Sequence, residues 1–527
     1  MAAGTTTDTA RTTAVAPPHL IDPVEVAIRT RAPEDPARTN RFEDTDPPRG
    51  LDLARSPRVA RILRDRKFQF LLILPNQIIF WLVIGIGLLG TVVPGLNFAT
   101  AITWYIWFCL VFVMMVVVGR AWCAMCPFGG FGEWVQRHTF WKRTTKPIGL
   151  GLKVPEKVGQ YGFLLSVGAF LLLTWIEEFF NIAGPGNPAA TSYMVLGIVG
   201  SALLFFLLFE RRSFCRYVCP LTSIIGTVGS MGSVAGFRTR DRDVCLSCET
   251  KSCMRGDADG FGCPWYTWPG SADSNLTCGL CSECYKACPS DNIGLYVQKP
   301  LTSVIAPSRR RADVAWSVAL LWGLVIYQQL NALTFFASLD NWLNAHTNFP
   351  QYPNPLDYLG VIALVALAMA GASRVIQALV GRRDAIVPAG GTSFVDRTSR
   401  FRLYFVPLMY GVIPVVGADY FARQLPKFFQ HATRVVPAVG HLFGAGSTSS
   451  SLYNTSIIGS NSGIIAVQVG VIAAGTLAAM YASWRIAGRD LAGVATSRRR
   501  VQVSAATFAL VCGIAAAVLY VLMNAAD

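Results

Sequence analysis

The chain has 527 residues, of which 52% are hydrophobic and 15% are charged, and its mean hydropathy is +0.41. These values exclude an ordinary soluble enzyme and indicate a protein that crosses a membrane several times. The net charge of +15 does not indicate nucleic-acid binding, because no basic stripe with interleaved aromatic residues is present. It fits the accumulation of Lys and Arg on the cytoplasmic loops of membrane proteins.

The N-terminal segment is rich in Thr, Ala, Pro, Asp and Arg and shows no apolar period. We expect residues 1–55 to be disordered, and we find no apolar stretch typical of a secretory signal there. The basic residues 55–67 that follow are expected to lie along the inner membrane surface.

Nine stretches are apolar over roughly the 20 residues that a helix needs to cross a membrane. They are residues 68–90, 101–119, 160–182, 193–209, 313–336, 357–380, 402–422, 463–484 and 503–524. Lys and Arg gather on alternate loops, whereas the loops at 91–100, 183–192 and 337–356 contain none. This pattern predicts a bacterial inner-membrane protein with its N-terminus in the cytoplasm and its C-terminus outside. The loop at 423–462 departs from it, because it carries basic residues on the outer side.

Two cysteine pairs follow the second and fourth of these stretches. They are Cys123 and Cys126, with Pro127 directly after, and Cys215 and Cys219, with Pro220 directly after. Each pair follows an apolar stretch, a basic residue and an aromatic residue, so we interpret the two regions as an internal repeat. Proline suits the first turn of a new helix. Each pair is therefore expected at a break between two helical pieces at the inner membrane edge.

The four cysteines of these pairs could meet at one metal centre, because thiolates suit an iron–sulfur cluster or zinc. A thiol–disulfide relay is a second interpretation, since a Cys-x-x-Cys can have a lowered thiol pKa. Purely structural thiols are a third. The two pairs differ by one residue in spacing, which does not favour a perfectly symmetric site.

Eight cysteines lie between residues 245 and 288, and their spacing is not that of a disulfide framework. The second half of this stretch reads C-x2-C-x2-C-x3-C-P, the run that holds a 4Fe-4S cluster in bacterial ferredoxins. In that run three closely spaced thiolates bind one cluster and the fourth cysteine binds a neighbouring cluster. A partner motif is therefore required, and it is present as C-x2-C-x4-C followed by a separate Cys-Pro.

The exchange of the fourth cysteine predicts two ligand sets. Cluster one would be bound by Cys245, Cys248, Cys253 and Cys288. Cluster two would be bound by Cys278, Cys281, Cys284 and Cys263. Zinc ions on Cys-x2-Cys pairs would leave the triplets and both Cys-Pro endings unexplained. Disulfides need an oxidising compartment, whereas the loop charges place this stretch in the cytosol.

Two carboxylates, Glu177 and Glu178, lie near the outer end of the third stretch. Acids at membrane depth are costly and often functional, so they could accept protons from a quinol oxidised near the outer face. Equally, they could lie in interfacial water within an aromatic belt. His346, His431 and His441 are expected in outer loops. Two of them could ligate haem or copper, but none lies inside a span at paired spacing, so we interpret them as solvated loop residues.

Residues 70–300 resemble the membrane polyferredoxin family that includes NosR, NapH and the cytochrome oxidase assembly protein CcoG. The resemblance rests on spans ending in two Cys-x3-Cys-Pro motifs, here with one residue fewer in the first, followed by the two-cluster module. It implies electron transfer between the quinone pool or cytosolic donors and an acceptor at the membrane or beyond it. The flavin-binding domain of NosR and the immunoglobulin-like tail of CcoG are not found, and five further spans stand in the C-terminal half.

The sequence thus predicts an α-helical membrane protein of about nine spans with an inserted cytosolic ferredoxin-like α+β module. The expected domains are the disordered tail (1–55), a membrane domain with two Cys-Pro half-repeats (56–240), the two-cluster module (241–300) and a C-terminal membrane domain of five spans (301–527). The predicted function is electron transfer, as a subunit of an oxidoreductase that could oxidise quinol and could belong to a larger membrane complex. The alternative is an assembly or redox-sensing protein that reduces a metal ion or cofactor for a partner oxidoreductase.

Overall fold

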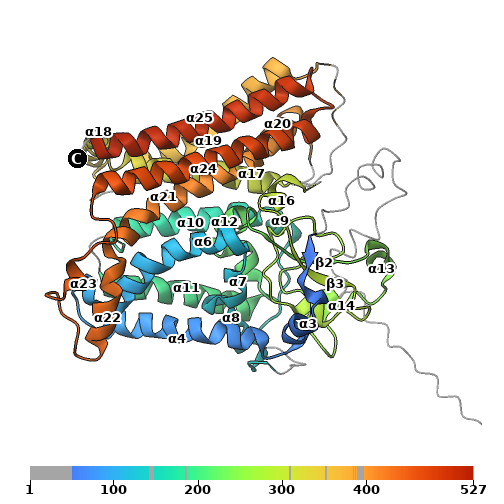
Figure 1. Ribbon diagram of the computed structural model, residues 1–527, viewed down its shortest axis with the longest axis horizontal. Coiled ribbons are helices and arrows are strands. Elements are labelled where there is room, and N and C mark those ends of the chain that lie inside the picture. Colours follow the sequence, from blue (N-terminus) through green and yellow to red (C-terminus); the bar gives the residue numbers. More distant parts are fainter. Residues whose placement is uncertain are drawn as a thin grey trace, which may run out of the picture. The chain divides into compact units, whose positions relative to one another are not determined.

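Figure 1 shows the computed structural model of the chain. It describes residues 50–525 except 142–147, 184–186, 308–309, 351–352, 384, 386 and 388–396. The chain divides into two units, residues 1–46 and 47–527, and everything described below belongs to the second. Residues 1–49 of the tail that we expect to be disordered lie outside the described residues.

Seven helices of the described chain are long and apolar enough to cross a membrane. They are α4 (Phe68–Leu89), the continuous helix of α5 (Phe98–Thr100), η4 (Ala101–Trp107) and α6 (Phe108–Val118), α10 (Gly162–Phe179), α11 (Pro188–Leu208), α19 (Pro355–Val380), α24 (Asn461–Ile486) continued by η7 (Ala487–Leu491), and α25 (Arg498–Ala525). Each coincides with one of the stretches expected from the sequence. The chain is therefore a mostly helical protein with the helices of a membrane protein.

The other two expected stretches are bent helix pairs. The first is α17 (Ala312–Leu330) with α18 (Thr334–Thr347), which meet at 99°. The second is α20 (Arg400–Gly411) with α21 (Ile413–His431), η6 (Ala432–Arg434) and α22 (Val435–Leu442), bent by 42°. Pro414, in the first turn of α21, lacks the N–H that would continue the helix. The described chain thus holds seven candidate spans, or up to nine if each bent pair crosses once.

Both cysteine pairs lie at breaks between two helical pieces, as the prolines predict. In the first, α7 (Trp122–Met125) gives way to α8 (Pro127–Arg137) at Cys126, which has the extended angles φ −67° and ψ 124°. In the second, the π-helix η5 (Phe214–Val218) gives way to α12 (Leu221–Gly229) at Cys219, with φ −51° and ψ 120°.

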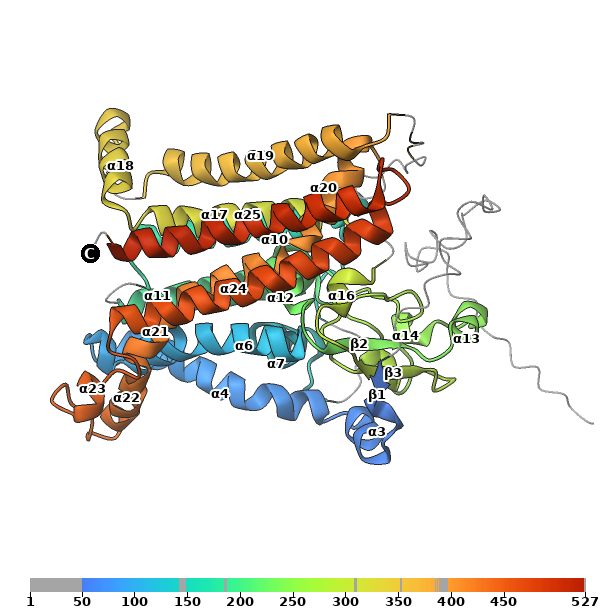
Figure 2. The same cartoon turned by 45° about the horizontal axis from the view of Figure 1, so that its top comes forward.

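The cysteine-rich stretch is built around a three-stranded antiparallel sheet in the order β1-β3-β2. Its strands are β1 (Leu51–Asp52), β2 (Val234–Thr239) and β3 (Ile293–Val297), and its short helices are α13 (Arg242–Ser247), α14 (Ser252–Arg255), α15 (Glu283–Lys286) and α16 (Thr302–Ile305). We call residues 234–307 the module. Figures 1 and 2 show the module at one end of the long helices, with α22 and α23 (Ser451–Asn454) at the opposite end. We call these the module end and the far end.

The start of the described chain corrects the expected boundary of the tail. Strand β1 and the turn η2 (Leu53–Arg55) fall inside residues 1–55, yet β1 pairs with β3. The side chain of Asp52 is 7% exposed and receives a hydrogen bond from Arg240 at 2.9 Å. The long-range pairing with β3 orders this segment, and composition alone cannot reveal such a pairing.

The basic segment that follows forms α3 (Pro57–Arg64), and this helix contacts the module. Arg64 donates a hydrogen bond to Asp291 at 2.7 Å and lies 5.4 Å from the ring centre of Tyr285. The remaining short helices are η3 (Pro94–Leu96) and α9 (Glu156–Gly159).

Candidate metal centres

The first group of cysteines in the module lines one pocket. Its members, which we call the distal group, are Cys245, Cys248, Cys253 and Cys288. Burial raises the pKa of the Cys253 thiol to about 12, and the charges of the other three thiols add to this effect. The four sulfurs therefore face one another, although they come from α13, α14 and the loop after α15.

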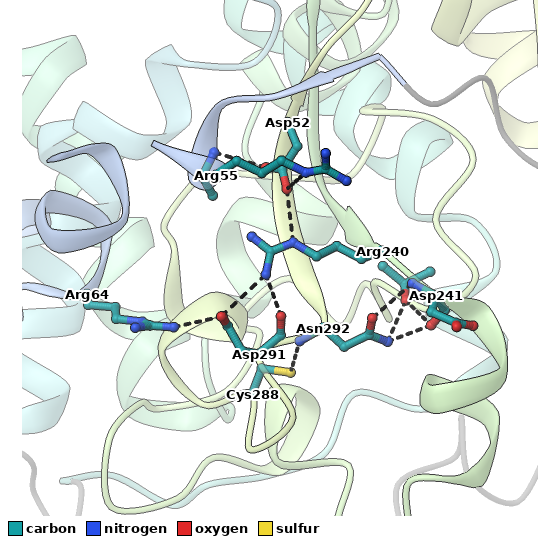
Figure 3. Close-up of polar contacts among 10 residues, drawn as sticks. Asp52, Arg55, Arg64, Arg240, Asp241, Cys288, Asp291 and Asn292 are labelled. Carbon is teal, nitrogen blue, oxygen red and sulfur yellow. Dashed lines mark hydrogen bonds and ion pairs between the residues drawn. The ribbon is translucent and has the colours of Figure 1, made fainter. Parts of the chain in front are cut away.

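Hydrogen bonds from Asn292 hold two sulfurs of the distal group. The backbone N–H of Asn292 donates to Cys288 Sγ at 3.3 Å, and its side-chain amide donates to Cys245 Sγ at 3.4 Å. Figure 3 shows the first of these bonds and the Arg240 side chain that contacts Asp52 and Asp291 beside it. Asn292 thus ties the end of the ferredoxin-type run to the first residue of the partner motif.

The second group in the module is more deeply buried. Its members, which we call the middle group, are Cys263, Cys278, Cys281 and Cys284. Burial holds the pKa of the Cys284 thiol well above its usual value, and the charges of the three partners raise it further. Gly236 at a bulge of β2 has φ +87°, and a Cβ there would lie 2.9 Å from Cys278 Sγ. A glycine is needed so that the strand can pass this close to the sulfur.

The third group joins the two cysteine pairs. Its members, which we call the membrane-edge group, are Cys123, Cys126, Cys215 and Cys219. Burial raises the pKa of the Cys126 thiol to about 12, with added contributions from the charges of Cys219 and Cys123. The charges of the other three cysteines likewise raise the pKa of Cys215, after burial. A Cβ on Gly129 of α8 would lie 3.2 Å from Cys215 Sγ, so the first repeat packs directly on the second.

Two arginines, each 1% exposed, flank the membrane-edge group. Arg120 donates to Cys123 Sγ at 3.4 Å, and Arg212 donates to the carbonyl oxygen of Cys123 at 3.0 Å. Arg212 also forms a buried ion pair with Glu133, whose other oxygen accepts from Arg137 at 2.8 Å. Burial acts to raise the pKa of Glu133, but these two cations outweigh it and keep the pKa below its usual value.

The three groups lie one after another. The backbone N–H of Cys263 donates to the carbonyl oxygen of Cys253 at 2.8 Å, which joins the distal and middle groups. Arg212 is close enough for its charge to interact with both Cys281 and Cys215, which joins the middle and membrane-edge groups. The buried ring of Trp265 lies 4.4 Å from the guanidinium carbon of Arg120 and 5.9 Å from that of Arg212.

The donor chemistry of each group fits an iron–sulfur cluster. In the described chain no three His, Cys, Asp or Glu side chains are close enough to hold a single metal ion. A 4Fe-4S cluster separates its thiolates more widely, because each binds a different iron. The irons would also neutralise four buried thiolates that otherwise repel one another.

The expected proton acceptors lie at the far end of α10, away from all three groups. Glu178 accepts a hydrogen bond from Gln328 at 2.8 Å and lies 3.9 Å from Arg423. Glu177 faces a cavity. The three histidines expected in loops lie instead in helices α18, α21 and α22, apart from the cysteines. His346 and His441 contact backbone oxygens of their own segments, and His431 lies against Tyr105.

Four residues beside the cysteines were not predicted from the sequence: Arg120, Arg212, Glu133 and Trp265. The basic residue before each cysteine pair was a visible signal of the two arginines. Glu133 and Trp265 carried no such signal, because their contacts with these arginines are made across more than 50 residues of sequence.

A protein-family model described as a 4Fe-4S binding domain matches the chain twice, at residues 100–146 and 191–236. Each match contains one cysteine pair with its preceding helix, so both halves of the internal repeat match the same domain. The matched residues support an iron–sulfur protein of ferredoxin-like character. No curated protein and no solved structure gives a match to the chain.

Proposed function

We propose that the chain is a membrane-bound electron-transfer protein with three iron–sulfur centres in a row. The distal and middle groups would each hold a 4Fe-4S cluster in the exchanged ligand sets expected from the sequence. The membrane-edge group would hold the third. With the module in the cytoplasm, as the loop charges favour, electrons would pass between the cytoplasmic surface and the interior of the helical bundle.

The observation that carries this proposal is the grouping of twelve cysteines into three sets of four. The sets are contiguous through Cys263, Trp265 and Arg212. The two matches to a 4Fe-4S binding domain support iron–sulfur chemistry at the membrane-edge group in particular. A thiol relay would use two sulfurs at a time and would not explain why the two pairs converge.

The protein's own residues would tune each centre. Cluster potentials depend on net charge, on hydrogen bonds to sulfur and on solvent exposure. Asn292 supplies two such hydrogen bonds to the distal group. Arg120 supplies one to the membrane-edge group, together with a positive charge that favours the reduced, more negative cluster.

A second candidate function is the reduction of a metal ion or cofactor for delivery to a partner oxidoreductase. It is favoured by the solvent access of the distal pocket, where the side chain of Cys248 is half-buried. Burial acts to raise the pKa of Cys248, but hydrogen bonds from Thr250 and Lys251 outweigh it and lower the pKa. A cytoplasmic species could approach this group directly.

The test is turnover by anaerobically purified holoprotein. Dithionite-reduced protein is mixed with an artificial electron acceptor, and the cluster absorbance and EPR signals are followed through repeated cycles. Electron transfer predicts full, reversible reoxidation of every cluster and steady turnover. Rapid reduction of free cupric or ferric ions with slow use of the artificial acceptor would favour the second candidate, and zinc in place of iron would contradict both.

A further inference from the structure

A small pocket lies where the module meets the helical bundle. Its empty volume is about 280 Å³, its open mouth included. Trp265 and Thr277 of the module line one side of it, and residues of α9, α10 and η5 line the other. Figure 1 shows α9 beside the module, at the module end of the long helices. The pocket therefore lies at the same end of the bundle as the three cysteine groups.

Three arginines from separate segments line this pocket. Arg120 follows α6, Arg216 lies in η5 and Arg311 directly precedes α17. Among the described residues that line the pocket, none is an aspartate or a glutamate. The charges of Arg216 and Arg311 are close enough to repel one another. The fold thus brings positive charge together at this junction.

Two of the three arginines have partners for their charge. Arg311 donates two hydrogen bonds to the carboxylate of Asp313, at 2.9 and 2.6 Å. Arg120 donates to Cys123 Sγ at 3.4 Å, so its charge acts on the membrane-edge group. Neither arginine therefore accounts for an excess of positive charge in the pocket.

The guanidinium of Arg216 is the cation that lacks a carboxylate. In the described chain no hydrogen bond or ion pair holds it. It lies instead against the rings of Tyr217 and Tyr266, 5.1 and 5.0 Å from their centres. The side chain is half-buried, and a buried charge is costly unless it is paired. An anion in the pocket would supply the missing partner.

Hydroxyl groups and a helix N-terminus surround the same space. The hydroxyl of Thr277 accepts a hydrogen bond from Thr267 at 3.0 Å, which leaves its own proton for a ligand. The hydroxyl of Tyr217 has no partner within the described chain. No side chain caps the N-terminus of α10, a helix of 18 residues, and such an end carries partial positive charge. These groups all favour a ligand with several oxygen acceptors.

Two glycines keep the pocket open. A Cβ on Gly162 would come within 2.9 Å of the ring of Tyr217. A Cβ on Gly159 of α9 would lie 3.5 Å from the hydroxyl oxygen of the same tyrosine, which is an ordinary contact. A small side chain at position 159 would therefore enter the pocket without displacing the backbone.

We propose that this pocket binds a phosphate group, and that the bound anion makes the two adjacent iron–sulfur centres harder to reduce. A guanidinium fork and hydroxyl donors match the oxygens of phosphate. The phosphate belongs either to a free anion or to the headgroup of an anionic lipid, because the pocket lies at the module end of the long helices.

The effect on reduction rests on the electron-transfer function proposed above. Arg120 contacts Cys123 of the membrane-edge group, and the charge of Cys263 of the middle group interacts with Arg216. An anion between these arginines would oppose the added negative charge of a reduced cluster on either side.

The binding test uses anaerobically purified holoprotein in detergent, after removal of bound lipid. Inorganic phosphate and dihexanoyl phosphatidylglycerol are titrated separately by calorimetry. Binding of inorganic phosphate would assign the pocket to a free anion, and binding of the lipid alone would assign it to a headgroup. Either result supports the proposal. Binding of neither would overturn it, and so would acetate that competes as strongly as phosphate.

The first variant is Arg216→Gln, which removes the guanidinium that lacks a carboxylate. It should weaken binding of the phosphate probe at least about tenfold. Arg485→Gln is the matched control, because Arg485 lies 5.7 Å from the ring centre of Tyr481 but is exposed on α24. This control should bind the probe as the unaltered protein does, and equal binding by the two variants would overturn the proposal.

The second pair of variants leaves the arginines in place. Gly159→Asp brings a carboxylate into the pocket and should weaken binding of the probe at least about tenfold. Gly159→Asn has nearly the same size without the charge and should weaken binding less. Equal losses in the two variants would contradict an anion site.

The effect on the clusters is measured by comparing the affinity of oxidised and dithionite-reduced holoprotein for the same probe. The reduced protein should bind it at least about fivefold more weakly, because coupling between two sites is reciprocal. Equal affinities would overturn the link to the clusters. Protein without a reducible cluster would contradict the electron-transfer function itself, whereas the comparison of Arg216→Gln with Arg485→Gln would still test the pocket.

Discussion

The distal and membrane-edge groups each consist of four cysteines, but their surroundings differ. The distal group lies among short loops near the surface, and hydrogen bonds from Asn292 hold its sulfurs. The membrane-edge group is assembled from two repeats and is enclosed by the buried Arg120 and Arg212. Burial disfavours the reduced, more negative state of a cluster, whereas nearby cations favour it. The two buried arginines thus offset, at the membrane-edge group, the effect of burial on a reduced cluster.

The first prediction concerns the loss of one ligand of the distal group. Cys253→Ser should abolish one cluster and lower the iron content by about four per chain, because a cubane needs four ligands. Chemical analysis of iron and sulfide measures the loss. Cys109→Ser is the matched control, because Cys109 is a buried cysteine outside all three groups, and its iron content should not change. Equal iron contents in the two variants would contradict the ligand assignment.

The second prediction concerns stability. Glu133 is 3% exposed and is paired with two arginines, so Glu133→Gln should destabilise the protein by about 3–5 kcal/mol. Asp291→Asn breaks the ion pairs of the more than half-exposed Asp291 with Arg64 and Arg240, and should cost less than about 1 kcal/mol for each pair. Thermal unfolding in detergent compares the two. Similar losses of stability in the two variants would contradict a larger contribution from the buried ion pairs of Glu133.

The third prediction concerns the reduction potential of the membrane-edge group. Arg120→Gln removes a positive charge and the hydrogen bond to Cys123 Sγ. It should lower that potential by tens of millivolts, on a scale where about 59 mV is a tenfold change for one electron. An EPR-monitored redox titration measures it, and Arg120→Lys should lower the potential less. The clusters of the module serve as an internal reference, and a shift in all clusters alike would count against a local effect.

The fourth prediction concerns the charged surface of the module. Asp243 and Glu249 are exposed beside the distal group. Reversing both charges with Lys should slow electron exchange with a cationic partner protein a few-fold and weaken its salt dependence, because surface charge acts through steering. Stopped-flow kinetics at two ionic strengths would show this. The rate with an uncharged acceptor should not change, and an equal change with both acceptors would rule out steering.

The sequence predicted the features that depend on local spacing. Seven apolar helices and the helix breaks at Cys126 and Cys219 are found where expected. The ligand sets of the two clusters in the module stay a prediction until iron is measured, although their cysteines do lie together. Each of these features depends on residues that lie close together in the sequence.

Contacts between segments distant in the sequence could not be predicted from local spacing. The pairing of β1 with β3, the ion pair of Arg212 with Glu133 and the position of Trp265 all join residues far apart in sequence. The bends after α17 and α20 were not predicted, because the apolar composition continues through them. The cavity that Glu177 faces could not be predicted either, because it is lined by residues from both halves of the bundle.

We propose above that the membrane-edge group completes a row of three iron–sulfur centres. The most direct measurement is iron and acid-labile sulfide per chain in anaerobically purified protein, compared with its Cys219→Ser variant. Three clusters predict about twelve irons and twelve sulfides, falling to about eight in the variant, with loss of one EPR signal. About eight irons in both proteins, with the same EPR spectrum, would contradict it.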